Sequence, residues 1–519
     1  MDQTVSPQPL LVEKAAAWGM RQFKENKLPL LSAILFGLLA YTFAFTNKLV
    51  NHDEVGQLFG KGATVSSGRW GLGALDSIFP NYSMPWIYGI ITILLIAVAI
   101  CIIIRIFAIR HKLLQVLMAG SIMVFPSLIG LFGYMFTSAS YAVSFLLAVL
   151  AVWCLQRPSK LFILPAMGCM IFSLSIYQSY LSIAVSLLVL ILIQRLLTEE
   201  NALPILRQGI LYVIFLVVSL ALYYAATQVV LRIKGISFND YASDSITLSL
   251  STILDGIVLA YVNFIRFFTW AHHRLMPTSL SRWVHLMLFL SIAVLMLVWM
   301  IRQKPKAFRL VLLILLLAIL PLAINCMYMI TAEGSIHTLV LYSFVAVYIL
   351  GALTADHMLT ICVGIRFFEL VRRAALNFVV ATLSVIIIVN TYVANASYLN
   401  MHLRYENSYA FYTSLMADLK MMPEFTPETK IAMIGSWDAP DFYEYNLEFT
   451  HYLVGVTGFS PNTYSQQAFM EYYLGFPISF ASGEEIAVIS ESPEFTEMAT
   501  YPYYGSMKII DNILVVKLS

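Results

Sequence analysis

Charged side chains are scarce in this chain. Only 12% of its 519 residues are Asp, Glu, Lys or Arg, whereas 60% are hydrophobic. Soluble domains carry roughly 25% charged and 45–50% apolar residues, so the composition excludes an ordinary soluble protein and indicates a polytopic membrane protein. The formal net charge of +2 is too small to indicate a nucleic-acid-binding protein, and no block of basic residues suggests one.

Cysteine is also rare. The five cysteines lie in or beside apolar segments without metal-binding spacing, which favours small buried side chains over disulfides or zinc ligands. The sequence also lacks a Gly-rich phosphate loop on the side that we expect to be cytoplasmic. The first apolar run, Pro29–Val50, follows a long polar lead and is too long for the apolar core of a signal peptide. The cysteines are Cys101, Cys154, Cys169, Cys326 and Cys362.

Long apolar segments, in contrast, are abundant. About eleven are long enough to cross a bilayer as helices. The sixth is short, and we infer it from the polar break Tyr177-Gln178-Ser179-Tyr180, which divides one long apolar stretch in two. The predicted spans are 29–50, 85–104, 113–132, 139–155, 161–176, 181–193, 210–231, 284–301, 310–330, 338–354 and 374–393.

Lys and Arg gather in alternate loops between these spans. By the positive-inside rule these loops are cytoplasmic, which places the N-terminus inside and the C-terminus outside. The basic clusters are Lys14, Arg21, Lys24 and Lys27; Arg105, Arg110 and Lys112; Arg157 and Lys160; Arg195 and Arg207; Arg302, Lys304, Lys306 and Arg309; and Arg366, Arg372 and Arg373.

Four segments then lie outside the membrane: the loop 51–84, the turn Gly133–Ser138, the stretch 232–283 and the tail 401–519. Within 232–283, the semi-apolar piece Ile253–Trp270 is interrupted by polar residues, so we interpret it as an interfacial helix and not as a span. We divide the chain into a transmembrane domain, 1–400, and an extracytoplasmic α/β domain, 401–519.

The tail differs in character from the rest of the chain. Its predicted elements are a helix over Met401–Met422, strands at Lys430–Ile434 and Ile486–Ser490, a helix start at Ser492-Pro493 and a terminal hairpin of Ser506–Ile509 with Ile513–Leu518. The tail is rich in tyrosine. We expect most of these rings to fill the core of the small domain, with stacking on acceptor sugars as the alternative.

The first outer loop begins with an acidic pair, Asp53 and Glu54, preceded by His52. Asn51 followed by Glu54 resembles a capping box, in which each side chain satisfies the other residue's backbone amide. This pattern predicts a structural role for Glu54. Neighbouring helical residues do not share a face, so Asp53 is left to point elsewhere.

The motif His52-Asp53-Glu54, followed by Gly68-Arg69-Trp70 on a multi-span chain with an external C-terminal domain, resembles the GT-C class of membrane glycosyltransferases. Within that class it is similar to the bacterial Gtr-type glucosyltransferases of O-antigen serotype conversion. In that family the acidic pair is often two aspartates, whereas here the second residue is Glu54, which leaves open which carboxylate works.

This resemblance implies a polyprenyl-phosphate sugar donor, with undecaprenyl-phosphate glucose as the expected one. It implies as acceptor a hydroxyl of a lipid-linked or cell-surface glycan, such as the O-antigen of lipopolysaccharide. The active site would face the periplasm from the bacterial inner membrane. The chain would then contact membrane lipids and depend on a donor-synthesising enzyme and a flippase.

Such a transfer needs a carboxylate to take the acceptor proton and cations to stabilise the departing phosphate. We favour Asp53 as the base; in the alternative, Glu54 is the base and Asp53 holds a cation or Arg69. No cofactor is required by the sequence and no metal site is predicted, although a divalent cation near the carboxylates is left open. The candidate phosphate ligands are Arg69, Arg232, Lys234, Arg266, His272, His273 and Arg274, and the candidate sugar or acceptor ligands are His52, Trp70, Tyr177, Gln178, Tyr180, Glu333 and His337.

Two of these assignments have a purely structural alternative. His272, His273 and Arg274 also fit an interfacial anchor that meets lipid headgroups, and Arg69 fits a salt bridge that merely holds the loop.

Three rival functions of the whole protein stay open as well. A transporter or flippase of lipid-linked sugars should carry ionisable residues within its spans, and the predicted spans carry almost none. An outer-face acyltransferase would need a nucleophile–base pattern that we do not find. A non-catalytic polysaccharide-assembly protein is compatible with the sequence.

Overall fold

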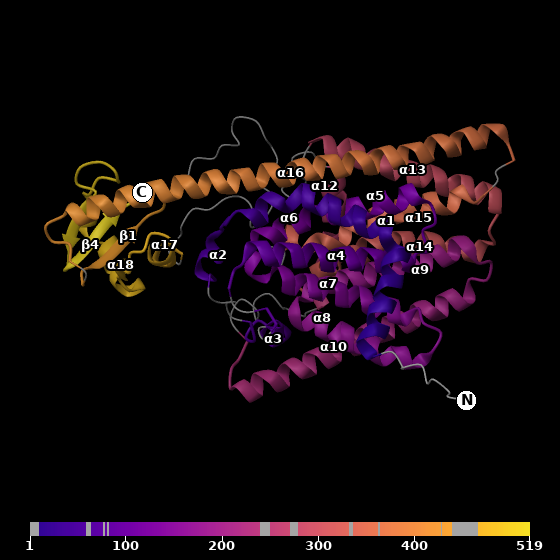
Figure 1. Cartoon of the computed structure of the whole chain (residues 1–519), viewed down its shortest axis with the longest axis horizontal. Coiled ribbons are helices and arrows are strands. Elements are labelled where there is room, and N and C mark those ends of the chain that lie inside the picture. Colours follow the sequence, from indigo (N-terminus) through magenta and orange to yellow (C-terminus); the bar gives the residue numbers. More distant parts are fainter. Residues whose placement is uncertain are drawn as a thin grey trace, which may run out of the picture.

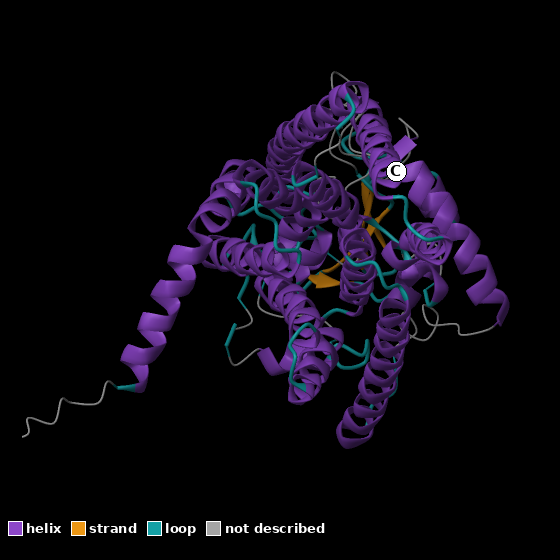
Figure 2. Cartoon of the chain, turned by 90° about the vertical axis from the view of Figure 1, so that its right-hand side faces the viewer, coloured by secondary structure: helices purple, strands orange, loops and turns teal. Residues whose placement is uncertain are grey.

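The computed structural model is a bundle of helices with a small α/β domain beyond one end (Figure 1). It describes residues 10–58, 64–75, 78–79, 82–238, 250–269, 279–331, 336–361, 364–426, 428–437 and 465–519. Viewed from the opposite end of the bundle, many of the helices are seen nearly end-on, with the strands of the small domain behind them (Figure 2).

Within the described residues, ten helices are long and apolar enough to cross a membrane, and the bent pair α5–α6 raises the number to eleven. The chain is therefore a multi-pass membrane protein, as the composition predicts. The helices of the bundle are α1 (Leu11–Thr46), α4 (Pro85–Ile106), α5 (Lys112–Met123), α6 (Pro126–Gly133), α7 (Met135–Leu155), α8 (Ile163–Ile176), α9 (Leu181–Thr198), α10 (Leu203–Lys234), α12 (Leu250–Thr269), α13 (Ser279–Gln303), α14 (Ala307–Ile324), α15 (Val345–Leu359) and α16 (Arg366–Met421).

Short elements complete the bundle. Two short helices, α2 and α3, lie in the loop between α1 and α4. Short 3₁₀ helices precede α8, α9 and α15, and another follows α14. They are α2 (His52–Gly56), α3 (Trp70–Ala74), η2 (Lys160–Phe162), η3 (Gln178–Tyr180), η4 (Cys326–Met329) and η6 (Thr338–Phe344).

The bend between α5 and α6 has a local cause. Pro126 has no backbone N–H, so the carbonyl of Ile122 lacks the usual bond from residue 126 and keeps only a long one, at 3.4 Å, from the Phe125 N–H. In the apolar interior of a membrane protein a freed carbonyl must find another donor. The hydroxyl of Tyr342 donates to the Ile122 carbonyl at 3.1 Å, and the hydroxyl of Tyr41 donates to the Met123 carbonyl at 2.8 Å. Two tyrosines thus stabilise a 41° bend.

Two of the span predictions fall at the limit of what length and composition decide. The expected span 161–176 forms a helix over Lys160–Ile176, which is apolar but shorter than the ten candidate spans. In contrast, α12, which we interpreted as interfacial, is long and apolar enough to count as a candidate span over Ser251–Thr269. Its polar residues interrupt the apolar run without shortening the helix, so length and composition alone do not separate the two cases.

Contacts at one end of the bundle bring the basic loops together. Arg105 pairs with Glu25 at 3.1 Å, Asp356 accepts from the backbone N–H of Arg110 and His111, and Arg309 Nε donates to the Leu196 carbonyl at 2.6 Å. The loop before α5, the end of α9, the start of α14 and the end of α15 therefore meet at one end, which we call the basic end. The structure thus places these basic clusters on one side, as the alternating charges predict.

The opposite end, which we call the far end, carries α2, α3 and η4. The chain leaves α10 there, because Tyr223 and Thr227 hydrogen-bond the loop that precedes α3 and its first residue. It also enters α13 from the far end, because α13 finishes at the basic end, where Trp299 Nε1 donates to the Leu197 carbonyl at 3.2 Å. The end of α10 and the start of α13 therefore lie at the same end, and a single crossing by α12 would not fit this arrangement.

The C-terminal domain is attached through α16, a 56-residue helix that runs from the bundle into the domain without a break (Figure 1). The proposed boundary at residue 400 therefore falls inside a continuous helix. Beyond α16 a four-stranded sheet has the strand order β2-β1-β4-β3, in which only β3 and β4 are antiparallel neighbours. The elements are β1 (Lys430–Ile434), α17 (Gln466–Tyr472), β2 (Ser479–Phe480), α18 (Gly483–Ser490), α19 (Pro493–Thr496), β3 (Met507–Ile510) and β4 (Ile513–Lys517).

Most of the predicted tail elements are present. The strand Lys430–Ile434, the helix start at Ser492-Pro493 and the terminal hairpin are confirmed. The predicted strand Ile486–Ser490 is wrong, because this segment belongs to α18. Ser482 and Glu485 form a complete capping box there, which starts a helix where the short apolar run alone is ambiguous.

Side chains alternate between the two faces of the sheet. Ala432, Ile513 and Val515 pack toward α18 on one face. Leu514 and Val516 face a second core, which also contains Tyr412 and Leu415 of α16 and Phe469 of α17. Val50 and Val55, on either side of the acidic pair, belong to this second core as well. The C-terminal domain is therefore packed directly onto α2, and not only joined to the bundle through α16.

The arrangement of the two ends predicts the sidedness of three exposed positions. Cysteines introduced at Ser237 and Tyr504 should react with a membrane-impermeant maleimide in intact cells, because both lie at the far end, which the charge bias places outside. A cysteine at Ser159, at the basic end, should react only after lysis. The unmodified chain gives the background from the native cysteines. Labelling of Ser159→Cys alone in intact cells would reverse the orientation, and opposite results for the two far-end positions would contradict this chain path.

Candidate active site

The acidic helix α2 is held by its N-cap residue. The side chain of Asn51 accepts a hydrogen bond from the backbone N–H of Glu54 at 2.8 Å, which satisfies one of the free amides of the first turn. Its amide nitrogen donates to the carbonyl of Gly133 at 2.7 Å, at the end of α6. Asn51 is buried. One side chain therefore starts the helix and fixes it to the bundle, as the Asn51–Glu54 spacing predicts in part.

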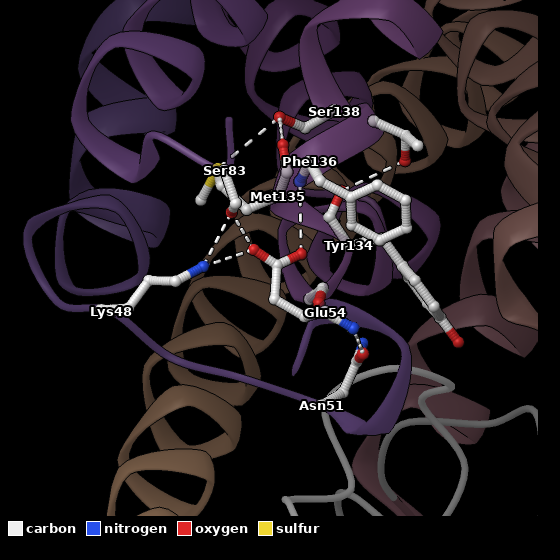
Figure 3. Close-up of polar contacts among 10 residues, drawn as sticks. Lys48, Asn51, Glu54, Ser83, Tyr134, Met135, Phe136 and Ser138 are labelled. Atoms are coloured by element: carbon white, nitrogen blue, oxygen red, sulfur yellow. Dashed lines mark hydrogen bonds and ion pairs between the residues drawn. The ribbon is translucent and has the colours of Figure 1, made fainter. Parts of the chain in front are cut away.

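The carboxylate of Glu54 departs from the predicted capping box. Instead of reaching back to Asn51, it is fully buried and accepts from Lys48 Nζ at 2.6 Å, from the hydroxyl of Ser83 and from the backbone N–H of Phe136 at 3.2 Å (Figure 3). The amide of Phe136 lies in the first turn of α7, where helix amides lack intrahelical partners and a negative charge is favoured. Glu54 thus joins α1, α2, the start of α4 and α7.

Asp53 has a different environment from its neighbour. Its side chain is 42% exposed, and its carboxylate lies 3.9 Å from Nε2 of His52, whose side chain is 43% exposed. Because a catalytic base must reach the acceptor hydroxyl, an accessible carboxylate is better suited to this role than one that is enclosed by three donors. The structure therefore shows that the two carboxylates differ in burial, a difference that the sequence predicts only in part.

The second motif of the first outer loop, Gly68-Arg69-Trp70, forms a turn that neighbouring helices hold in place. Gly68 has a φ of +76°, and a Cβ there would lie 2.9 Å from the hydroxyl of Tyr223, so both the backbone and the space require glycine. The hydroxyl of Tyr223 donates to the Gly68 carbonyl at 3.0 Å. Gln178 Nε2 bonds the Ser67 carbonyl at 3.2 Å, and Trp70 Nε1 donates to Thr227 at 3.1 Å.

Arg69 faces an aromatic group. Its guanidinium lies 5.5 Å from the ring centroid of Tyr177 and donates to the hydroxyl of Tyr141 at 3.3 Å, and the two tyrosine rings stack with centroids 4.2 Å apart. His337 is close enough for its charge state to be affected: burial, and secondly the Arg69 charge, lowers the pKa of His337 to about 4. The imidazole is therefore neutral at physiological pH, and Arg69 supplies the positive charge here.

The acidic and the arginine clusters meet on α7. Phe136, which donates to Glu54, and Tyr141, which accepts from Arg69, are five residues apart on this helix, a rise of about 7.5 Å. The first two turns of α7 thus set the spacing between carboxylates and cation. This arrangement can hold an anionic group at Arg69 and a proton acceptor at Asp53 within one region of the far end.

The other candidate site residues that the structure describes are held by neighbouring side chains, exposed at the end of α10 or packed on other helices. Tyr180 is buried among Phe145, Tyr177 and Tyr342, and Trp70 is occupied in holding its turn, so both have structural roles. Arg232 and Lys234 lie exposed on the last turn of α10. Arg266 is on the last turn of α12, which packs on α13, α14 and η4 and not on the helices around Arg69. The candidates His272, His273, Arg274 and Glu333 lie outside the described residues.

The part of the chain that the structure describes contains no group of three or more His, Cys, Asp or Glu side chains placed to hold a metal ion. Asp53 and Glu54 alone would supply two carboxylates, and Glu54 is already occupied by three donors.

Several residues that hold the site together were not predicted from the sequence. Lys48 could have been noticed as a cation six residues before Glu54, at the end of an apolar run. Ser83, Tyr141 and Tyr223 carry no local signal, because their partners lie between 29 and 155 residues away along the chain.

A protein-family model described as glucosyl transferase GtrII matches residues 42–350. This match covers more than half of the chain and includes both α2 and the Arg69 turn, and it confirms the resemblance to Gtr-type glucosyltransferases. Comparisons with curated proteins and with solved structures gave no match.

The Lys48–Glu54 pair predicts a specific stability pattern. Lys48→Met should destabilise the protein by about 3 kcal/mol or more, because it leaves the fully buried Glu54 carboxylate without its counter-charge. Glu54→Gln should destabilise it less, because the Lys48 side chain is 29% exposed and keeps access to water. The double variant should be more stable than the sum of the two losses predicts. Thermal unfolding of purified protein in detergent measures this.

Lys420→Met is the matched control, because Lys420 lies over the ring of Phe476 at 3.5 Å and the change removes the same charge outside the pair. Additive losses in the double variant, or an equal loss in the control, would show that the ion pair does not hold these segments.

Proposed function

Because the chain belongs to the glucosyl transferase GtrII family, we propose that it transfers glucose from a polyprenyl-phosphate donor to a hydroxyl of a lipid-linked or cell-surface glycan such as O-antigen. The observation that carries this proposal is that the matched region, residues 42–350, contains an accessible carboxylate and an arginine at the same end of the bundle. Membership of this family makes the protein a membrane glycosyltransferase. The donor, the acceptor and the mechanism are our proposals.

The proposed reaction is a direct displacement. The acceptor hydroxyl oxygen attacks the anomeric carbon of glucose, the bond from that carbon to the phosphate oxygen breaks, and the polyprenyl phosphate leaves with the electron pair. The acceptor proton passes to a carboxylate. The residues therefore have two tasks, to take a proton from the acceptor and to stabilise the negative charge that develops on the phosphate.

We assign the first task to Asp53. Its side chain is partly exposed, whereas Glu54 is enclosed by Lys48, Ser83 and the Phe136 amide. A carboxylate that is already paired and buried would have to lose these partners before it could accept a proton from a substrate. Glu54 therefore acts as the anchor that positions α2, and Asp53 projects from that anchored helix.

The second task falls to Arg69, and His52 and His337 are candidate hydrogen-bonding groups for the sugar. Arginine suits a phosphate because its planar fork binds two oxygens at once. The aromatic rings of Tyr141 and Tyr177 restrict the guanidinium to one orientation, so less freedom is lost when the phosphate binds.

Location supports the same assignment. We place the far end on the periplasmic side of the inner membrane, because the basic loops lie at the other end. A lipid-linked donor presents its phosphate at the membrane surface, where the Arg69 turn leaves the bundle. The donor would have to be made and moved to that face by other proteins, a donor-synthesising enzyme and a flippase.

The base assignment predicts that Asp53→Asn reduces the transfer rate roughly a hundredfold or more, the usual scale of general-base catalysis. The change keeps size and shape but removes basicity. Donor binding should persist, because Arg69 is untouched. The measurement is transfer of radiolabelled glucose from undecaprenyl-phosphate glucose, with purified protein and a glycolipid fraction from the native membrane.

Glu54→Gln is the comparison for this assay. Its loss of activity should follow its loss of folded protein, since the role of Glu54 is structural. An active Asp53→Asn beside a folded but inactive Glu54→Gln would exchange the two roles, and two active, folded variants would remove the acidic pair from catalysis.

The phosphate assignment predicts that Arg69→Lys is harmful although it keeps the charge. Lysine cannot reproduce the two-pronged contact with the phosphate, so the transfer rate should fall by roughly tenfold or more. Arg207→Lys, exposed in the first turns of α10 on the side that the charge bias makes cytoplasmic, serves as control and should transfer normally. If Arg69→Lys and Arg69→Ala both keep full activity at normal protein levels, Arg69 does not hold the phosphate.

A further inference from the structure

The C-terminal domain forms one wall beside the acidic helix. Val50 and Val55, on either side of Asp53 and Glu54, share a core with Phe469 and Met470 of α17, and α17 contacts α2 directly. This places a seam between α2 and α17 next to the proposed base. The region of the chain that supplies α17 lies outside residues 42–350, so the family match does not account for it.

Tyr473, which directly follows α17, has an unusual hydroxyl. Its oxygen is buried and has no hydrogen-bond partner among the described residues. The ring is well held, because it stacks on Phe469 at 5.4 Å between centroids and meets the edge of Tyr405 at 6.0 Å. A buried polar group without a partner costs stability and needs an explanation.

A second donor at the same junction has the same property. Arg404 precedes Tyr405 on α16, and its Nε is buried without a hydrogen-bond partner among the described residues. Met401 and Ser408, one turn before and after it, are buried, so this face of α16 is turned inward. Both groups have a hydrogen to donate, and sugar oxygens are acceptors of the kind that would satisfy them.

The hydroxyl of Tyr473 lies near the anchor of the site. Burial, and secondly the charge of Glu54, raises the pKa of Tyr473 well above its ordinary value. The phenol therefore stays protonated at physiological pH and keeps a hydrogen to donate. Such a group can bind a sugar oxygen next to the carboxylates without taking the proton that Asp53 must accept.

We infer that the acceptor glycan binds at the seam between α2 and α17, and that the hydroxyl of Tyr473 donates a hydrogen bond to one of its oxygens. This rests on the proposed function and names the acceptor subsite within it. The rings of Tyr409 on α16 and Tyr472 at the end of α17 are 42% and 44% exposed and offer flat apolar faces with hydroxyls at their edges. This combination suits a sugar, which has C–H faces and a rim of oxygens.

The acceptor fits this seam better than the donor does. The donor carries a lipid tail, so its phosphate is confined to the membrane surface near Arg69. The C-terminal domain lies beyond the end of the bundle (Figure 1), where a water-soluble glycan chain approaches. Because the Tyr473 oxygen is enclosed in this structure, the side chains that cover it have to change rotamer before the glycan reaches it, a change that is common at binding interfaces.

The test uses Tyr473→Phe in the full-length protein and O-polysaccharide released from the host's lipopolysaccharide as probe. Removing only the hydroxyl should raise the equilibrium Kd for the polysaccharide about three- to tenfold, the scale of one hydrogen bond. The KM for undecaprenyl-phosphate glucose should not change. The unfolding temperature should stay the same or rise, because an unpartnered buried group is removed.

Tyr412→Phe is the matched control. Its hydroxyl lies in the same core but is bonded by Gln466 at 3.3 Å, so this variant should lose stability and keep the Kd. A Tyr473→Phe that binds the polysaccharide like the parent, or that loses stability as the control does, overturns the inference, as does a parent protein that does not bind the polysaccharide. A parent that binds it but transfers no glucose would instead refute the proposed function and leave the subsite standing.

Discussion

The organisation of the far end depends on one buried carboxylate. Glu54 is fully enclosed, and its two oxygens receive a lysine, a serine hydroxyl and a helix amide that come from separate parts of the chain. A buried charge is tolerated only when it is paired and hydrogen-bonded. The end of α1, the acidic helix, the segment before α4 and the start of α7 must therefore meet where they do, and every other feature of the proposed site is arranged around that meeting point.

This constraint explains how an exposed residue can be placed accurately on a loop. Asp53 lies one position before Glu54 on a helix of five residues, which would be marginal in isolation. Its backbone is fixed on one side by Asn51 and Glu54, and on the other by Val55, which belongs to the core of the C-terminal domain. The domain therefore has a physical role in holding the acidic helix, independent of any contact with substrate.

Much of the fold is predictable from the sequence because the signals are local, such as turn and cap residues, or are totals over a segment, such as apolar length and charge. Apolar length predicts nearly all of the spans, and the alternation of Lys and Arg predicts which helix ends lie together. The hairpin around Asp511-Asn512 follows from turn chemistry, and both residues adopt positive φ, as two-residue hairpin turns require. The errors have equally local causes. The capping box of Ser482 and Glu485 was present in the sequence, and it outweighs the strand preference of the apolar run after it.

The candidate site was predicted less completely, because its chemistry depends on contacts over long sequence separations. The spacing of Asn51 and Glu54 predicts the cap, and the cap is present through the backbone amide of Glu54. It does not predict where the Glu54 side chain goes, because Lys48, Ser83 and Phe136 come together only in the folded bundle. The same holds for Arg69, whose environment is made by Tyr141 and Tyr177 of two other segments.

The two adjacent carboxylates therefore acquire different roles from their surroundings and not from their own chemistry. A helix turns about 100° per residue, so of two consecutive acidic residues one can face the interior and the other the solvent. The interior one is neutralised by Lys48 and can serve as a fixed anchor, while the outer one keeps an accessible carboxylate. The longer side chain of glutamate suits the anchor, because it must extend from α2 to the first turn of α7. The presence of glutamate at the second position of the pair is then explained by this reach, and the catalytic work that we propose is left to the aspartate.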